Sequence, residues 1–396
     1  MTLTMLSDET LAFGEKVMPA ILGVDALYRA ESKDGDGLAV LNMDTEGRYP
    51  PAPYASYREA AEAWKALRAE AATLPEEDRR VYYGQLCRST LTFLRWRAGM
   101  AHFEEQLIGF LHVPAAPVAD AELDALAGEI RTLLSRMGYD GDLKAQCAAW
   151  EERHRVPPDE VEGVLAELMS QAWDRTQERL VDIPADKSDG MKAQAVTGVA
   201  YNARCDYLKR TVQINVEPVL TRPSLKHLTV HEGYPGHYVQ FKLRETWARE
   251  GTAPADVLLS VVNTASSSVF EGIADTGMKM IDWVEDDDDR VQALMTRYRA
   301  GIGTGAAWRL HGLHMPVEKV TDWLRDRSLL GGEGWVQNRM AFINAPARAV
   351  LIWSYWWGEH VVAPAWHKAK SAGKKDEFVR FLYGRMHSND SVGMFA

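Results

Sequence analysis

Residues 223–241 read PSLKHLTVHEGYPGHYVQF, and they place two histidines and a glutamate where a helical pattern is interrupted. The interruption lies at residues 233–236, which contain two glycines and Pro235. Proline has no amide hydrogen, and its ring would strike the carbonyl four residues back, which belongs to His231. The flanking glycines allow unusual backbone angles. The segment therefore predicts an active-site helix that is kinked between His231 and His237.

The kink matters because the two histidines could not otherwise bind one ion. On an unbroken helix, residues six apart point roughly 120° away from each other. A widened turn or kink would bring His237 back beside His231. Two imidazoles with a nearby carboxylate are the groups that a catalytic zinc needs, with one position left for water. We therefore predict a site for Zn²⁺, or another divalent metal, in which Glu232 is the general base for a metal-activated water.

A different pairing of histidines is also open. His227 lies four residues before His231, and two histidines at this spacing share a helix face without any distortion. By spacing alone, the pair of His227 and His231 is favoured over the pair of His231 and His237. The residues by themselves do not decide between them.

The rest of the chain predicts a mainly α fold. At 396 residues with 46% apolar content, the chain can bury a substantial core. Apolar residues recur at helical spacing, and the one clear strand pattern is TVQINV at 211–216. A polar, broken stretch near 183–196 suggests an N-terminal helical region (1–190) and a catalytic region with the metal site (191–396). One continuous compact domain is the alternative.

The helices that we expect share apolar periodicity and are bounded by proline, glycine or polar residues. Ser224 is the expected N-cap of the helix that carries His231. The other expected helices span about 8–29, 55–73, 77–111, 119–137, 142–153, 158–182, 255–283, 288–311, 316–328, 336–369 with breaks at Pro346 and Pro364, and 375–387.

Composition excludes several classes of partner. The net charge is −11 and no basic stripe appears, which argues against nucleic acid. The first residues lack the basic start and apolar core of a secretory signal, and no apolar run approaches the roughly 20 residues that span a bilayer. The three cysteines are scattered and form no CxxC pair. We expect a cytoplasmic protein without a membrane partner, and its oligomeric state is open.

From this motif onward, over about 195–396, the chain resembles the bacterial DUF885 family, whose members are assigned as zinc metallopeptidases. The hallmark of that family is roughly H-E-x-x-P-G-H-x-x-Q. The matching residues here are His231, Glu232, Pro235, Gly236, His237 and Gln240. The hallmark has no histidine at the position of His227, so the resemblance favours the pair of His231 and His237.

A second family element, E-G-W-A-x-Y, supplies the third metal ligand in the family. This chain has Glu271-Gly272-Ile273-Ala274-Asp275-Thr276, which keeps Glu-Gly-x-Ala and loses both aromatics. The resemblance therefore implies Glu271 as the third ligand. A carboxylate on an otherwise apolar helix also requires a partner. Asp275, one turn later, is either a hydrogen-bond partner of a ligand histidine or a surface acid.

The resemblance continues more weakly through 339–358, against R-Y-x-x-P-G-Q-A-x-S-Y-x-x-G. Arg339 and Tyr355 keep their order, whereas the gaps on both sides of Pro346 are longer. Tyr and Arg side chains opposite a catalytic metal stabilise the oxyanion of a tetrahedral intermediate. Arg339 and Tyr355 are therefore candidate catalytic residues beside Glu232.

Together these features predict a metal-dependent hydrolase that cleaves an amide or peptide bond in a small peptide or small-molecule amide. The missing family aromatics leave an alternative, a metal-dependent tailoring enzyme or lyase that acts on a small metabolite. A metal-binding protein without turnover is a further alternative, although a retained Glu232 argues against it. The sequence does not specify the substrate.

Overall fold

The computed structural model describes residues 6–32, 37–199 and 201–395 of the chain, and the fold is mainly α, as predicted. Contacts between Cα atoms group the chain into two compact units. The first comprises Met1–Ala115, Gln240–Gly272 and Trp357–Ala396; the second comprises Ala116–Val239 and Ile273–Trp356. The boundary predicted near residue 190 falls within the second unit.

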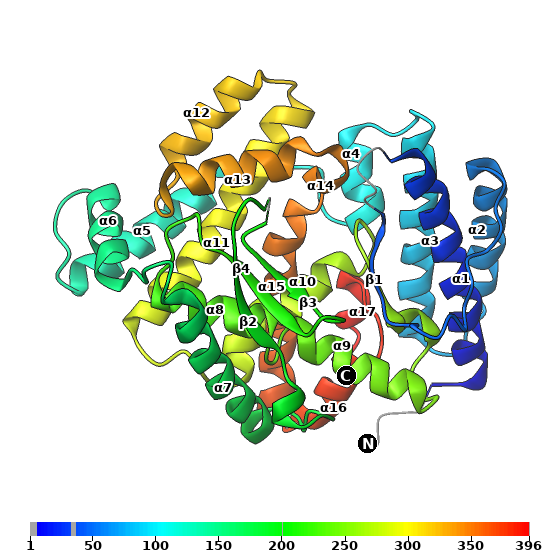
Figure 1. The fold of residues 1–396 in the computed structure, drawn as a ribbon. Helices are drawn as coiled ribbons and strands as arrows, with labels where there is room; N and C mark the ends of the chain where they lie inside the picture. The colour runs from blue at the N-terminus through cyan, green and yellow to red at the C-terminus, as the bar shows by residue number, and fades with distance from the viewer. Residues whose placement is uncertain (1–5, 33–36, 200, 396) are drawn as a thin grey trace. The chain divides into compact units, whose positions relative to one another are not determined.

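The helices and strands follow one another along the chain as labelled in Figure 1. The helices are α1 (Asp8–Glu31), α2 (Tyr57–Ala71), α3 (Glu77–Arg97), α4 (Phe103–Gln106), α5 (Asp120–Arg136), α6 (Leu143–His154), α7 (Val161–Arg179), α8 (Arg222–Glu232), α9 (His237–Arg249), α10 (Ser267–Met280), α11 (Asp287–Ala307), α12 (Val317–Arg327), α13 (Gly332–Asn344), α14 (Pro346–Ala349), α15 (Ile352–Ser371), α16 (Lys375–Gly384) and α17 (Asn389–Val392). The strands are β1 (Ala39–Asn42), β2 (Lys192–Val196), β3 (Ala203–Asp206), β4 (Thr211–Asn215) and β5 (Leu259–Val261). Turns of π-helix extend α4 over Leu107–Leu111 and α11 over Trp308–Gly312.

In the first unit, α1, α2 and α3 pack side by side (Figure 1). The helix predicted over 77–111 instead ends at Arg97, because Gly99 takes a left-handed backbone with φ of 71°. The prediction of one helix over 255–283 was also wrong. Its beginning is a short 3₁₀ turn followed by β5, which pairs antiparallel with β1. Only a partner distant in sequence turns this apolar run into a strand.

In the second unit, the predicted strand is confirmed as β4, the central strand of a three-stranded sheet. It runs parallel to β2 and antiparallel to β3. Val212 and Ile214 alternate with partly exposed neighbours and are fully buried, which is the pattern of a strand with one covered face. Helix α7 packs against β2 and α8, so the sheet lies next to the helix that carries His231 (Figure 1). The strands β1, β2, β3 and β5 exceed the single small β element that we expected.

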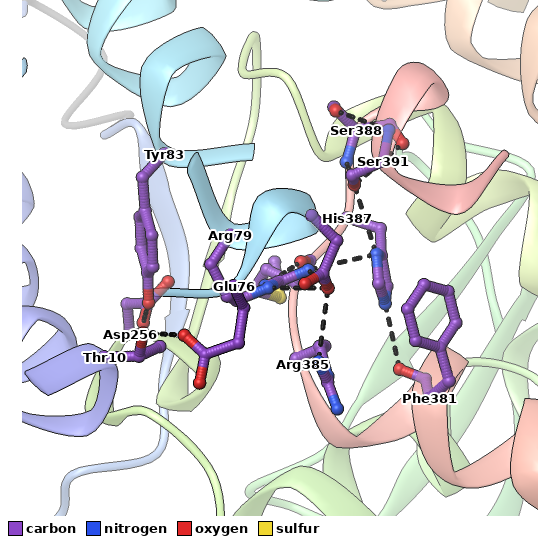
Figure 2. A network of polar contacts seen from close by, with 12 residues as sticks. Thr10, Glu76, Arg79, Tyr83, Asp256, Phe381, Arg385, His387, Ser388 and Ser391 are labelled. Atoms are coloured by element: carbon purple, nitrogen blue, oxygen red, sulfur yellow. Dashed lines mark hydrogen bonds and ion pairs between the residues drawn. The ribbon is translucent and has the colours of Figure 1, made fainter. Parts of the chain in front are cut away.

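A buried polar network in the first unit ties α3 to the C-terminal segment (Figure 2). The guanidinium of Arg79, fully buried, donates to the carbonyl of Met386 at 2.7 Å and lies 3.2 Å from Nδ1 of His387. The other ring nitrogen of His387 lies 2.9 Å from the carbonyl of Phe381. Burial, followed by the charge of Arg79, lowers the pKa of His387 well below its usual value. The imidazole is therefore neutral at pH 7 and serves as a structural bridge.

Asp256 in the same unit predicts a pH-dependent stability. Burial raises the pKa of Asp256 from its usual 3.8 to about 6, although Tyr83 donates a hydrogen bond to it at 2.8 Å (Figure 2). The folded state thus binds this proton more tightly than the unfolded state, so stability falls as the pH rises from about 4 to about 6. Asp256→Asn keeps the acceptor for Tyr83 and removes the titration. Over this window we expect the variant to gain about 2–3 kcal/mol of unfolding free energy relative to wild type.

The measurement is urea unfolding of wild type, Asp256→Asn and the exposed control Glu129→Gln at several pH values. A constant difference between wild type and Asp256→Asn across the window would contradict the buried, titrating carboxyl.

Candidate metal centre

Helix α8 begins about one turn earlier than we predicted with Ser224 as its N-cap. Its N-cap is Thr221, whose hydroxyl accepts from the amide of Ser224 at 3.2 Å. Ser224 occupies the third helical position, and its Oγ accepts from the amide of Thr221 at 2.9 Å. The prediction of Ser224 as the cap was wrong, because Pro223 fits within the first turn, where no amide hydrogen is needed. The reciprocal pair fixes where the helix starts.

Helix α8 ends at Glu232 and α9 begins at His237, so two helices replace the single kinked helix that we predicted. The residues between them include a cis peptide bond before Pro235. The amide of Gly236 donates to the carbonyl of Val230 at 3.0 Å, which folds the chain back over the last turn of α8. A Cβ on Gly236 would lie 1.9 Å from the carbonyl oxygen of His231, so only glycine fits there. The break is thus wider than a kink, and a glycine is required at its end.

Aromatic packing supports this connection. The hydroxyl of Tyr234 accepts from the amide of Met191 at 2.7 Å. Its ring meets Trp173 edge-on, with centroids 5.0 Å apart, and Tyr238 in the same way at 5.2 Å. Burial raises the pKa of Tyr234, so the phenol stays neutral. These contacts fix the path of the chain that carries His237.

The break brings the two histidines together. The ring centroids of His231 and His237 are 4.7 Å apart at an interplanar angle of 81°. His231, His237 and Glu271 each offer a ligand atom, and these atoms all lie within 4.8 Å of one another. Each of the three residues is at most 9% exposed. The predicted ligands therefore form one buried group of two imidazoles and a carboxylate.

Asp275 orients one of these histidines. Nδ1 of His231 lies 2.8 Å from Oδ1 of Asp275, which comes from α10 and is 8% exposed. Burial by itself would raise the pKa of Asp275, but the charges of His231 and His227 and their hydrogen bonds outweigh it and hold the pKa well below its usual value. With Nδ1 engaged by the carboxylate, Nε2 of His231 is the nitrogen that a metal could bind. Glu271 lies four residues before Asp275 on the same helix, which places both acids on one face.

The rival histidine lies close by as well. The ring of His227 is 5.9 Å from that of His231, and its Nε2 lies 3.5 Å from Oδ1 of Asp275. His227, His231 and Asp275 form a second group with ligand atoms within 4.8 Å, in which His227 and Asp275 are only partly buried. In this group Asp275 would be a ligand, whereas in the first group it orients His231. Geometry therefore leaves both pairings open, and variants must separate them.

Cys205 is a neighbour of Glu232 that sequence reasoning missed. Burial raises the pKa of the Cys205 thiol well above its usual value, and the negative charge of Glu232 adds to the effect. Glu232 itself is 7% exposed. No spacing in the sequence relates β3 to the end of α8, so only the folded chain reveals this electrostatic interaction. The thiol therefore remains protonated at neutral pH.

Arg339 on α13 and Tyr355 on α15 are brought near each other. Burial lowers the pKa of Arg339, and the phenol of Tyr355 opposes this effect. Neither residue belongs to the two groups of potential metal ligands. The structure thus pairs the two residues that the weaker sequence resemblance singled out.

No family model matches the chain, and no curated protein matches it. Among solved structures, the chain is similar to a putative lipoprotein from Colwellia psychrerythraea, with a TM-score of 0.56 and 14% identity over 88% of this chain and 70% of that one. A putative lipoprotein of unknown function from Shewanella oneidensis gives a TM-score of 0.53 and 12% identity over 85% and 70%. At this identity the likeness shows a shared fold alone. Among the described residues, no helix is long and apolar enough to cross a membrane. A cytoplasmic location stays a prediction.

Proposed function

We propose that this protein is a metal-dependent hydrolase of amide or peptide bonds, with His231, His237 and Glu271 as the ligands of Zn²⁺ or another divalent metal. The observation that carries the proposal is the buried group of two imidazoles and a carboxylate with ligand atoms within 4.8 Å. Two nitrogens and one oxygen suit zinc and leave a position open for water. The hydrogen bond from His231 to Asp275 fits the usual orientation of a ligand histidine. When bound, the metal would supply Lewis acidity and lower the pKa of water.

Glu232 is the proposed general base. It is the last residue of α8, directly after His231, and it is buried. From this position its carboxylate can accept the proton of the attacking water and deliver it to the leaving amine. The motif resemblance supports the same role, because its H-E pair matches His231 and Glu232. Proton transfer by Glu232 distinguishes this proposal from a protein that only binds metal.

Arg339 and Tyr355 are the candidates for contacting the substrate. A phenol or a guanidinium can stabilise negative charge as it develops on the carbonyl oxygen. The two residues interact electrostatically, since Tyr355 opposes the effect of burial on the pKa of Arg339. The substrate class in this proposal is a small peptide or small-molecule amide.

The test is an activity screen of chelator-treated protein, before and after addition of Zn²⁺, against short peptides and small amides. Metal analysis of wild type, His227→Ala, His231→Ala, His237→Ala and Glu271→Ala accompanies it. We expect hydrolysis only with metal, and loss of metal from the last three variants. If His237→Ala retained the metal and His227→Ala lost it, the metal would be bound by the rival group of His227, His231 and Asp275 instead. A product formed by bond cleavage without the addition of water would indicate a lyase instead.

Asp275→Asn should weaken metal binding without abolishing it. The amide cannot carry the negative charge that raises the basicity of His231, and such losses typically cost 10- to 100-fold in metal affinity. Competition with a chromophoric zinc chelator measures the change, and the exposed acid Glu129→Gln serves as control. An unchanged affinity would show that Asp275 is unconnected to the site, and complete loss would favour Asp275 as a direct ligand beside His227.

A further inference from the structure

Two arginines of the second unit face one tryptophan. Arg299 comes from α11, and its Cζ lies 5.2 Å from the ring centroid of Trp335. Arg339 comes from α13, and its Cζ lies 5.5 Å from the same centroid. Trp335 is 3% exposed and therefore holds a fixed position between helices. The fold thus brings two guanidinium groups close to the same tryptophan ring.

Neither arginine forms a salt bridge within the described part of the chain. The Nε atoms of Arg299 and Arg339 are buried without a hydrogen-bond partner. The chain carries 56 acidic residues against 45 Lys and Arg, so acids are in excess. Other arginines form salt bridges with these acids; for example, Nε of Arg325 lies 2.8 Å from Oε2 of Glu333. A buried N–H group without a hydrogen-bond partner carries a desolvation cost, which a ligand could offset.

Arg339 also lies close to the helix that carries Arg299. Gly303 lies one turn after Arg299 on α11, and a Cβ there would lie 3.8 Å from Cδ of Arg339 and 2.9 Å from Ile352. Such a Cβ would crowd Ile352 but would be in ordinary van der Waals contact with Arg339, so the side chain of Arg339 lies beside α11. The pKa of Arg299 is lowered to about 10, mainly by burial; the charge of Glu151 opposes this shift, and the charge of Arg339 adds to it. The like charges repel each other in the protein as described.

The local charge indicates which anion fits. Glu151 is the acid that faces Arg299, and its Oε1 is occupied by the amide of Gly331 at 2.6 Å. Two guanidinium groups and one carboxylate leave a single positive charge, which one monoanion neutralises. A guanidinium presents its Nε and Nη hydrogens side by side and binds the two oxygens of a carboxylate with both. Both arginines retain partial exposure, so a solute can reach them.

We propose that Arg299 and Arg339 form a subsite for a carboxylate group of the substrate, so that the protein acts on carboxylate-bearing amides such as N-acyl amino acids or short peptides. The substrate class rests on the proposed function, whereas the carboxylate subsite rests on the two arginines. Arg339 then binds the substrate's carboxylate, and Tyr355 remains as the candidate donor to the oxyanion. Arg299 has no part in the proposed chemistry and is the cleaner residue to vary.

The experiment measures binding of N-acetylglycine and of its neutral counterpart N-acetylglycinamide to chelator-treated protein by calorimetry. Removal of metal ensures that the carboxylate does not bind there instead. We expect saturable binding of the acid to wild type, at least tenfold weaker binding of the amide, and at least tenfold weaker binding of the acid to Arg299→Gln. The exposed arginine Arg131→Gln, on α5 of the same unit, should bind the acid like wild type.

Thermal unfolding of the same variants separates a binding role from a structural one. Arg299→Gln removes a repulsion, so its melting temperature should equal or exceed that of wild type without ligand. Equal binding of acid and amide, or unchanged binding of the acid to Arg299→Gln, would overturn the subsite. Inorganic phosphate that binds more tightly than the acid and displaces it would overturn the monoanion assignment. Binding of the acid without hydrolysis of any amide would defeat the proposed function and leave the subsite standing.

Discussion

Glu232→Gln should retain the metal and lose hydrolysis. The glutamine keeps the size and the buried position of Glu232 but cannot accept a proton at neutral pH. Positioned acid–base groups contribute about 10²- to 10⁴-fold to rate, so we expect a fall in kcat of that order. The proposed ligands His231, His237 and Glu271 are untouched, and zinc content should therefore match wild type. Steady-state kinetics with metal analysis on the same preparation make the measurement.

The neighbouring Cys205 supplies a control for this prediction. Its thiol lies near Glu232 and stays protonated. Cys205→Ser changes the packing beside Glu232 without removing a base, so kcat should change far less than in Glu232→Gln. If Glu232→Gln retained wild-type turnover with full metal content, the base would have to be another residue. If it lost the metal instead, Glu232 would be a ligand and the ligand set would need revision.

Apolar periodicity was sufficient to predict most helices and the strand at β4, because local spacing decides which face of an element is buried. It failed where a distant partner decides the structure. Leu259–Val261 forms a strand only because β1 pairs with it. Pro364 was expected to break a helix, yet α15 runs through it. The proline lies on the exposed side of that helix, where water can take the place of the missing hydrogen bond.

The candidate site, too, was predictable from the sequence only in part. Local chemistry made the break at 233–236 predictable, since Pro235 cannot continue the helix. The hydrogen bond between His231 and Asp275 joins residues 44 apart in sequence, and spacing could only offer it as one of two alternatives. No sequence pattern marked Arg299 as a candidate site residue, because only the folded chain shows that this arginine forms no salt bridge with the described residues. Sequence therefore indicated the candidate ligands, and the tertiary structure revealed the hydrogen bond between His231 and Asp275.

The second large effect is expected from Gly236→Ala, one residue before a proposed ligand. The added Cβ would lie 1.9 Å from the carbonyl oxygen of His231 and 2.3 Å from that of Val230. Neither atom can rotate away, because both belong to the backbone at the end of α8. The connection must shift, and it carries His231 on one side and His237 on the other. We expect a loss of roughly 3 kcal/mol of unfolding free energy, at the upper end for overpacked sites, and loss of tight metal binding.

Gly128→Ala is the matched control, because a Cβ there would meet nothing within 4 Å. It lies in the interior of α5, so alanine should leave metal binding unchanged and add about 0.5–1 kcal/mol of stability. Gly233→Ala is the intermediate case, with its Cβ 2.7 Å from the carbonyl of Thr229. If Gly236→Ala does not fold, Gly233→Ala should still fold and bind metal more weakly than wild type. Wild-type metal affinity in both variants would mean that the glycines do not set the distance between His231 and His237, and the wide break would lose its role in forming the site.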